Sequence, residues 1–123
     1  MLPSFTVNFV TGDTVPFKLT VTADETGQPL GSLEGYDLWM TAKLDPSVAD
    51  AAAQLRFSTV TGDARDGLIK RDGVVAWWEI PPALSATLVA KIPFDVQIRT
   101  PTGRIDTLVP GQLKPRSQIT RTA

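Results

Sequence analysis

The sequence predicts an all-β domain, namely an immunoglobulin-like β-sandwich of about seven to nine short antiparallel strands with one or two short helical turns. Among its 123 residues are 15 Thr, 11 Val and 6 Ile, and these β-branched residues favour strands over helices. A further 9 Gly and 10 Pro divide the chain into short runs. Within these runs apolar and polar residues alternate with period two, as in strands that bury one face. A β-barrel is the alternative architecture.

The predicted strands of the first half alternate clearly. Their inward sets are Phe5, Val7 and Phe9; Val15, Phe17, Leu19 and Val21; Tyr36, Leu38, Met40, Ala42 and Leu44; and Leu55, Phe57 and Thr59. The polar stretch 23–34 predicts a loop. Asp45 and Pro46 form a helix-start signal, so residues 47–54 are expected to form either a short helix or an irregular loop.

The second half continues the pattern. Asp72-Gly73 predicts a hairpin turn before a strand with Val74, Ala76, Trp78 and Ile80 on its inner face. Pro81-Pro82 ends that strand, and 83–90 predicts a crossover with a helical turn. Strands follow at 94–98 and 105–109, joined by a turn at 101–103. Pro110-Gly111 is expected to interrupt the last strand, leaving 112–123 as a final strand or a C-terminal arm of a single domain that spans 1–123.

Composition excludes much chemistry. The chain has no Cys and no His, so it has no disulfide, thiol nucleophile, imidazole base or His-ligated metal. The carboxylates are scattered over turns, and no pair has the apolar surroundings that an acid–base mechanism needs. The segment 62–67 resembles a calcium loop only loosely, and Arg65 opposes a cation there. We therefore expect no enzymatic activity, no metal and no cofactor.

Membrane and nucleic-acid roles gain no support. With 42% hydrophobic and 20% charged residues the chain is typical of soluble proteins, and its longest apolar run, 74–78, is too short to span a bilayer. The first residues lack the basic and apolar regions of a secretory signal, so synthesis in the cytoplasm is expected. The net charge of −1 does not favour binding to nucleic acid.

Two tryptophans are the best candidates for contacts with a partner. Alternation places Trp39 and Trp77 on the faces opposite the apolar sets of their strands, whereas Trp78 belongs to the core. An outward Trp is a common anchor for a protein partner. The alternatives are a sugar-stacking platform and packing beneath a loop.

The charged residues are unevenly distributed. Residues 1–50 hold seven acidic residues against Lys18 and Lys43, whereas the last ten hold Lys114, Arg116 and Arg121 with no acid. A basic end and an acidic front fit head-to-tail contact between copies in an oligomer or ring. Chance placement of solvated charges is the other interpretation. The three basic residues join the two tryptophans as candidate partner contacts.

Several ordered motifs resemble tailed-phage virion proteins. They are Gly12-Asp13-Thr14, the runs 39–43 and 50–53, the crossover 82–88, and Phe94-Asp95-Val96-Gln97. The ending, Gly103, then 106–111 and Ile119-Thr120-Arg121, is similar to that of the N-terminal domain of phage baseplate upper proteins and of small prophage proteins encoded among tail genes. The chain departs from the family pattern at Ile92-Pro93-Phe94, where members usually show a Gly-Tyr type of entry.

The resemblance implies a non-enzymatic virion protein of the tail, baseplate or neck, made in the host cytoplasm, that binds other virion proteins. It covers almost the whole chain. The alternatives are a carbohydrate-binding module that recognises a bacterial surface glycan through Trp39 or Trp77, and a decoration protein on the capsid surface.

Overall fold

The computed structural model describes residues 5–24 and 26–117, and this part of the chain is mainly β. It contains the strands β1 (Phe5–Val10), β2 (Val15–Thr20), β3 (Asp37–Ala42), β4 (Leu55–Ser58), β5 (Gly67–Leu68), β6 (Lys70–Asp72), β7 (Val75–Ile80), β8 (Ile92–Arg99) and β9 (Ile105–Arg116). The helix α1 (Pro82–Ser85) and the 3₁₀ turns η1 (Asp50–Ala52) and η2 (Thr61–Asp63) complete it. The prediction of a β-rich fold with short helical turns is confirmed.

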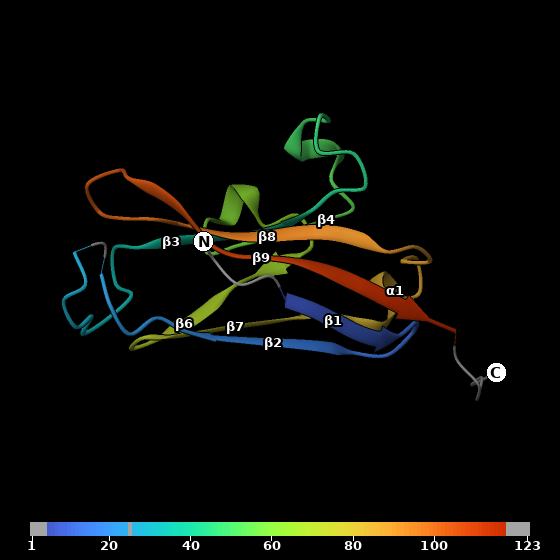
Figure 1. Ribbon diagram of the computed structural model, residues 1–123, viewed down its shortest axis with the longest axis horizontal. Helices are drawn as coiled ribbons and strands as arrows, with labels where there is room; N and C mark the ends of the chain where they lie inside the picture. Colours follow the sequence, from blue (N-terminus) through green and yellow to red (C-terminus); the bar gives the residue numbers. More distant parts are fainter. Residues whose placement is uncertain (1–4, 25, 118–123) are drawn as a thin grey trace.

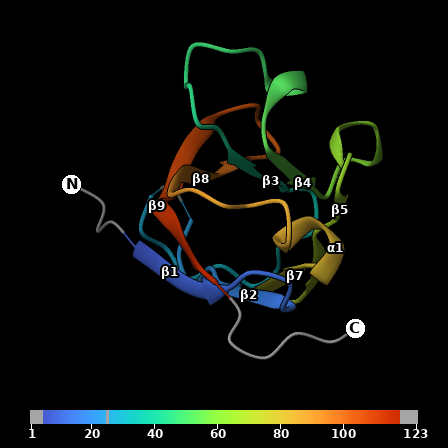
Figure 2. The ribbon, with the colours of Figure 1, turned by 90° about the vertical axis from the view of Figure 1, so that its right-hand side faces the viewer.

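The strands form two sheets that face each other around the core (Figures 1 and 2). One sheet is curled and has the order β1-β9-β8-β3-β4-β5, and the other has the order β2-β7-β6. The prediction that all strands are antiparallel is wrong at two places, because β1 pairs with β9 and β4 pairs with β5 in parallel. The observed architecture, a curled mixed sheet that faces a smaller sheet, is intermediate between the predicted sandwich and the alternative, a barrel.

The predicted alternation is confirmed in the central strands. Along β3, β7 and β8 every second residue is buried, and the buried core side chains are Phe9, Val15, Leu33, Leu38, Met40, Ala42, Leu55, Phe57, Ile69, Ala76, Trp78, Ile80, Leu88, Ile92, Phe94, Val96, Ile98 and Leu113. Leu44, predicted to face inward, is instead 52% exposed. Its backbone N–H donates to Gln54 Oε1 at 2.8 Å, because the chain has already left β3 for the loop over residues 44–54.

The helical segments are shorter than the sequence predicts. Asp45 Oδ1 accepts hydrogen bonds from the backbone N–H and the hydroxyl of Ser47, at 2.9 and 2.7 Å, and so closes a local turn. Only η1 follows, so most of 47–54 is irregular. At α1, Pro82 occupies the first turn, where its missing N–H costs no helical hydrogen bond.

The predicted interruption of the last strand at Pro110-Gly111 is wrong, and of the two alternatives for the segment that follows, the structure shows a strand. β9 runs without interruption through Pro110 and Gly111, and Leu113 is fully buried, so 112–116 is a strand and not an arm. Pairing of β1 with β9 starts only at Gly111. Pro110 therefore has a paired strand on one side alone, a position that tolerates proline. The rest of the predicted arm, 118–123, lies outside the described residues.

Candidate functional site

The structure places the two outward tryptophans on opposite sides of the molecule. Trp39 stands on the outer face of the six-stranded sheet, and Trp77 stands on the outer face of the three-stranded sheet. The core lies between them. Alternation predicted both orientations, but the two residues belong to two separate surfaces.

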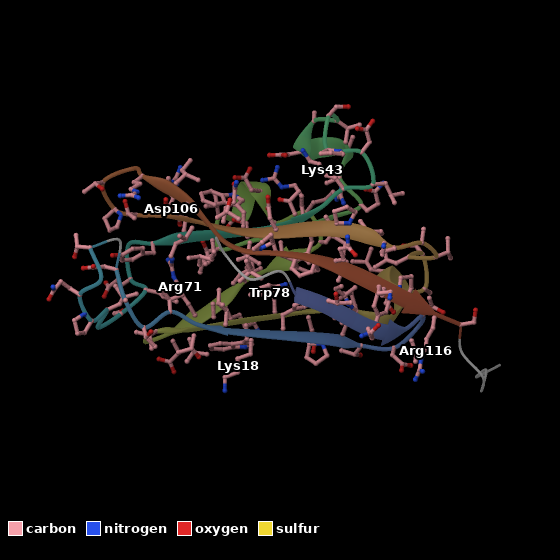
Figure 3. All side chains as sticks on the ribbon, viewed as in Figure 1. Lys18, Lys43, Arg71, Trp78, Asp106 and Arg116 are labelled. Atoms are coloured by element: carbon pink, nitrogen blue, oxygen red, sulfur yellow. The ribbon has the colours of Figure 1, made fainter. Side chains whose placement is uncertain are left out.

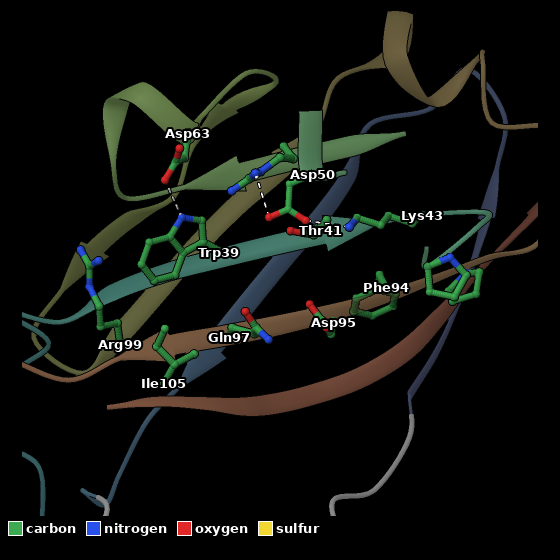
Figure 4. A pocket seen from close by; sticks show the side chains of 13 residues that line it. Trp39, Thr41, Lys43, Asp50, Asp63, Phe94, Asp95, Gln97, Arg99 and Ile105 are labelled. Atoms are coloured by element: carbon green, nitrogen blue, oxygen red, sulfur yellow. Dashed lines mark hydrogen bonds and ion pairs between the residues drawn. The ribbon is translucent and has the colours of Figure 1, made fainter. Parts of the chain in front are cut away.

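The surface around Trp39 is a groove with a volume of about 570 Å³ (Figure 4). Strand pairing sets two rows across its floor. One row is Arg56, Thr41 and Asp95, on β4, β3 and β8, and the next includes Trp39 and Gln97. The loops that carry η1 and η2 supply Asp50 and Asp63. We call this surface the Trp39 groove.

Internal contacts hold Trp39 in place. Its indole N–H donates to Asp63 Oδ2 at 3.0 Å, so the side chain braces η2 against the sheet. The Arg99 guanidinium carbon lies 5.0 Å from the centre of the ring, in a cation–π arrangement. Arg99 in turn donates to Asp37 Oδ2 at 2.6 Å. One ring face and the N–H are therefore already engaged within the chain.

Asp50 ties the loop over residues 44–54 to the groove. Its carboxylate lies 2.7 Å from Lys43 Nζ and 3.2 Å from Arg56 Nη1. Lys43 Nζ also donates to the carbonyl of Val48 at 2.8 Å. The hydrogen bond from Lys43 and the nearby Arg56 charge hold the pKa of Asp50 below its usual value, against the effect of partial burial.

Several polar groups in the same groove have no hydrogen-bond partner in the described residues. The side chains of Thr41, Asp95 and Gln97 make no hydrogen bond there, and the buried Arg56 Nε has no acceptor. Burial, together with the negative charge of Asp50, raises the pKa of Asp95. These groups offer donors and acceptors to a polar ligand. Alternation already placed Asp95 and Gln97 outward, but the pairing of β8 with β3 has no signal in the sequence.

The surface around Trp77 differs from the Trp39 groove in that its tryptophan is not held by a hydrogen bond or a ring contact in the described part of the chain. Trp77 is 39% exposed, and its indole has no hydrogen bond or ring contact within the described residues. Strand pairing places it between Lys18 on β2 and Lys70 on β6, and Figure 3 shows Lys18 projecting away from the body of the molecule. Leu68, 51% exposed, and Glu79 complete this surface, which we call the Trp77 face.

The basic C-terminal residues do not join either tryptophan. Lys114 and Arg116 are exposed near the end of β9, paired with Asn8 and Val10 of β1. Arg116 lines a hollow between the neighbouring parts of β1 and β2. Arg121, the third predicted basic contact, lies outside the described residues.

The described part of the chain, residues 5–24 and 26–117, contains no cluster of three or more acidic side chains with the geometry of a metal site. Its only α-helix has four residues, and none of its helices has the length and apolar character that crossing a bilayer requires.

No protein-family model matches the chain, and no curated protein is significantly similar to it.

Proposed function

We propose that the protein is a non-enzymatic structural protein of a tailed-phage or prophage virion, acting as an assembly or attachment module of the tail, baseplate or neck. The proposal includes an immunoglobulin-like relationship of the fold and a distant relationship to the N-terminal domain of baseplate upper proteins, supported by nine strands in two facing sheets within the described residues. It starts from the sequence motifs, since no family model matches.

The motif residues have defined structural roles in this fold. Gly103 adopts a φ of +95° in the turn between β8 and β9, a conformation that favours glycine. Residues 106–111 form the middle of β9, beside Phe94–Gln97 of β8. Two of the motifs behind the resemblance thus lie on adjacent strands, consistent with a shared fold.

The observation that carries the functional proposal is the exposure of Trp77 between two lysines. A large exposed aromatic ring with no hydrogen bond or ring stacking of its own is a common anchor of a protein interface, and Trp77 meets this description within the described residues whereas Trp39 does not. A protein that works by docking needs such an anchor.

Mass spectrometry of purified particles tests the proposal. Particles of the phage that encodes the chain should contain it, and Trp77→Ala should reduce its amount strongly without changing the melting temperature of the isolated protein by more than a few degrees. Ile105→Ala is the matched control, because Ile105 is an exposed apolar residue, 58% accessible, on the other sheet. Absence of the wild-type protein from particles, or equal incorporation of both variants, would refute the proposal.

A second candidate function is recognition of a bacterial surface glycan in the Trp39 groove. The unpartnered Thr41, Asp95 and Gln97 side chains favour it, because a hydroxyl-rich ligand can use all three. Sugar binding on a glycan array that is lost in Gln97→Ala and kept in Trp77→Ala would support this candidate. If the wild-type protein binds no sugar on the array, recognition of any glycan that the array carries is excluded.

The position of the copies in electron micrographs would separate a tail component from a capsid decoration protein.

A further inference from the structure

We propose that the open edge of β7 binds an extended acidic peptide segment of a neighbouring protein, which pairs with Trp78–Ile80 and seats an apolar side chain beside Trp78. The inference rests on the proposed function for the identity of the partner, a neighbouring virion protein. It adds the chemistry and conformation of the segment that the Trp77 face takes.

The edge arises from the path of the chain. β2 pairs with β7 over the whole of 75–80, but β6 pairs with it only over 75–77. Just before β6 the chain belongs to the other sheet, where β5 pairs with β4 and the Ile69 N–H donates to the Ser58 carbonyl at 2.8 Å. Residues 78–80 therefore have no strand on this side among the described residues. An open strand edge is a template for an added strand.

An opening with a volume of about 770 Å³ lies beside this edge, where β5 and β7 belong to different sheets. Its lining includes Phe57, 1% exposed, and Trp78, 5% exposed, so it reaches the core. Phe17 stacks on Trp78 with ring centres 5.3 Å apart. Gly67 keeps the opening wide, since a Cβ there would lie 3.2 Å from the Phe57 ring. These surroundings suit an apolar side chain.

The indole N–H of Trp78 indicates that the occupant also carries a hydrogen-bond acceptor. This N–H is buried and has no acceptor within the described residues, although buried indole N–H groups normally have one. Figure 3 shows Trp78 between the two sheets. A backbone carbonyl of a peptide paired with β7 supplies the acceptor, and a purely apolar ligand does not.

The charges around the opening select an acidic segment. Lys18 and Lys70 are exposed on both sides of Trp77 and form no ion pair in the described part of the chain. Asp66, which also lines the opening, already accepts from Arg65 at 2.8 Å and from the Arg56 N–H at 2.7 Å. Within the described lining, this leaves two lysines and one carboxylate, that of Glu79, without an ion-pair partner, so the free charges are mainly positive. An acidic residue next to the inserted apolar one complements this balance.

Selection from a random displayed peptide library tests the inference, with the full wild-type chain as the only bait. Selected peptides should carry Asp or Glu next to an apolar residue. Their affinity should fall about 30-fold in Trp77→Ala, the scale of a buried aromatic anchor. It should fall about tenfold in Lys70→Glu and stay unchanged in Lys91→Glu, a matched reversal of an exposed lysine just before β8.

Nuclear magnetic resonance of the three indole N–H groups gives a second readout. Peptide binding should move the Trp78 signal downfield and slow its exchange with water, while the Trp39 signal stays in place; Trp78→Phe assigns the signal. Selected peptides without acidic residues, equal binding by Trp77→Ala, or a shift at Trp39 instead of Trp78 would overturn the inference.

The two proposals fail separately. Peptide binding by a chain that is absent from purified particles would refute the proposed function and the identity of the partner, but would support the peptide-binding edge. Incorporation into particles without peptide selection would refute this inference alone.

Discussion

The contacts of the two outward tryptophans predict different costs for their removal. In Trp39→Ala the chain loses an indole hydrogen bond to the Asp63 carboxylate at 3.0 Å and a cation–π contact with Arg99 at 5.0 Å. A hydrogen bond to a charged group contributes about 1.5–3 kcal/mol, and an exposed cation–π contact about 0.5–1 kcal/mol. Because the groove is partly open to water we take the low end of each range, and we expect a loss of about 2 kcal/mol in the free energy of unfolding.

Trp77→Ala removes a side chain that makes none of these contacts, so the free energy of unfolding should fall by less than about 1 kcal/mol. Urea unfolding followed by far-ultraviolet circular dichroism measures both losses, because the backbone amides dominate this signal and the unfolding midpoint can be read in both variants. Trp39→Phe keeps most of the ring and isolates the hydrogen bond. A double-mutant cycle with Asp63→Ala should then show a coupling of about 1 kcal/mol. Equal losses in the two alanine variants, or no coupling to Asp63, would refute the claim that Trp39 holds η2 against the sheet while Trp77 makes no such contact.

Three further predictions follow from other contacts. Leu38→Ala and Met40→Ala, both fully buried on β3, should each cost about 2–5 kcal/mol, against less than about 0.5 kcal/mol for Gln97→Ala; similar losses would mean that the faces of β3 and β8 are assigned wrongly. Ser85→Ala should cost about 1–2 kcal/mol in thermal or urea unfolding, because the buried Ser85 hydroxyl accepts from the Gly12 N–H at 2.9 Å and donates to the Asp13 carbonyl at 2.6 Å. Ser47→Ala, at an exposed serine, is the control, and an equal loss in both variants would contradict a stabilising role for the buried hydroxyl. In acid the two groove carboxylates should affect the free energy of unfolding in opposite directions. The lowered pKa of Asp50 gives stability that is present above its unfolded value of 3.8 and is lost as the pH falls through the folded value, so Asp50→Asn should reduce the loss of stability in acid. The raised pKa of Asp95 means that Asp95→Asn should stabilise the protein at neutral pH, and this gain should disappear below 3.8.

Much of the fold could be predicted from the sequence because the local signals agree. Period-two alternation identified the buried faces of β3, β7 and β8, and Asp72-Gly73 identified the β6–β7 hairpin, where Gly73 has a φ of +59°. These features depend on neighbours in the chain. Alternation alone does not tell which strands pair.

The features that could not be predicted depend on distant parts of the chain. The parallel pairing of β1 with β9 joins residues about a hundred positions apart, and β9 continues through Pro110 because that pairing starts only at Gly111. The brace between Trp39 and Asp63 likewise requires η2 to lie over β3. Alternation showed that both tryptophans point outward, but only the position of the loops shows that one is engaged and the other is free.

Hydrogen exchange measured by mass spectrometry, on the isolated protein and on the protein in purified particles, tests the central claim most directly. The claim is that the protein docks through the Trp77 face and the open edge of β7. Exchange should slow in the particle over β2 and over 75–80, and should stay unchanged over 44–54 and 59–63, which carry η1 and η2 above the Trp39 groove. Protection confined to 44–54 and 59–63, or identical exchange in both states, would contradict it.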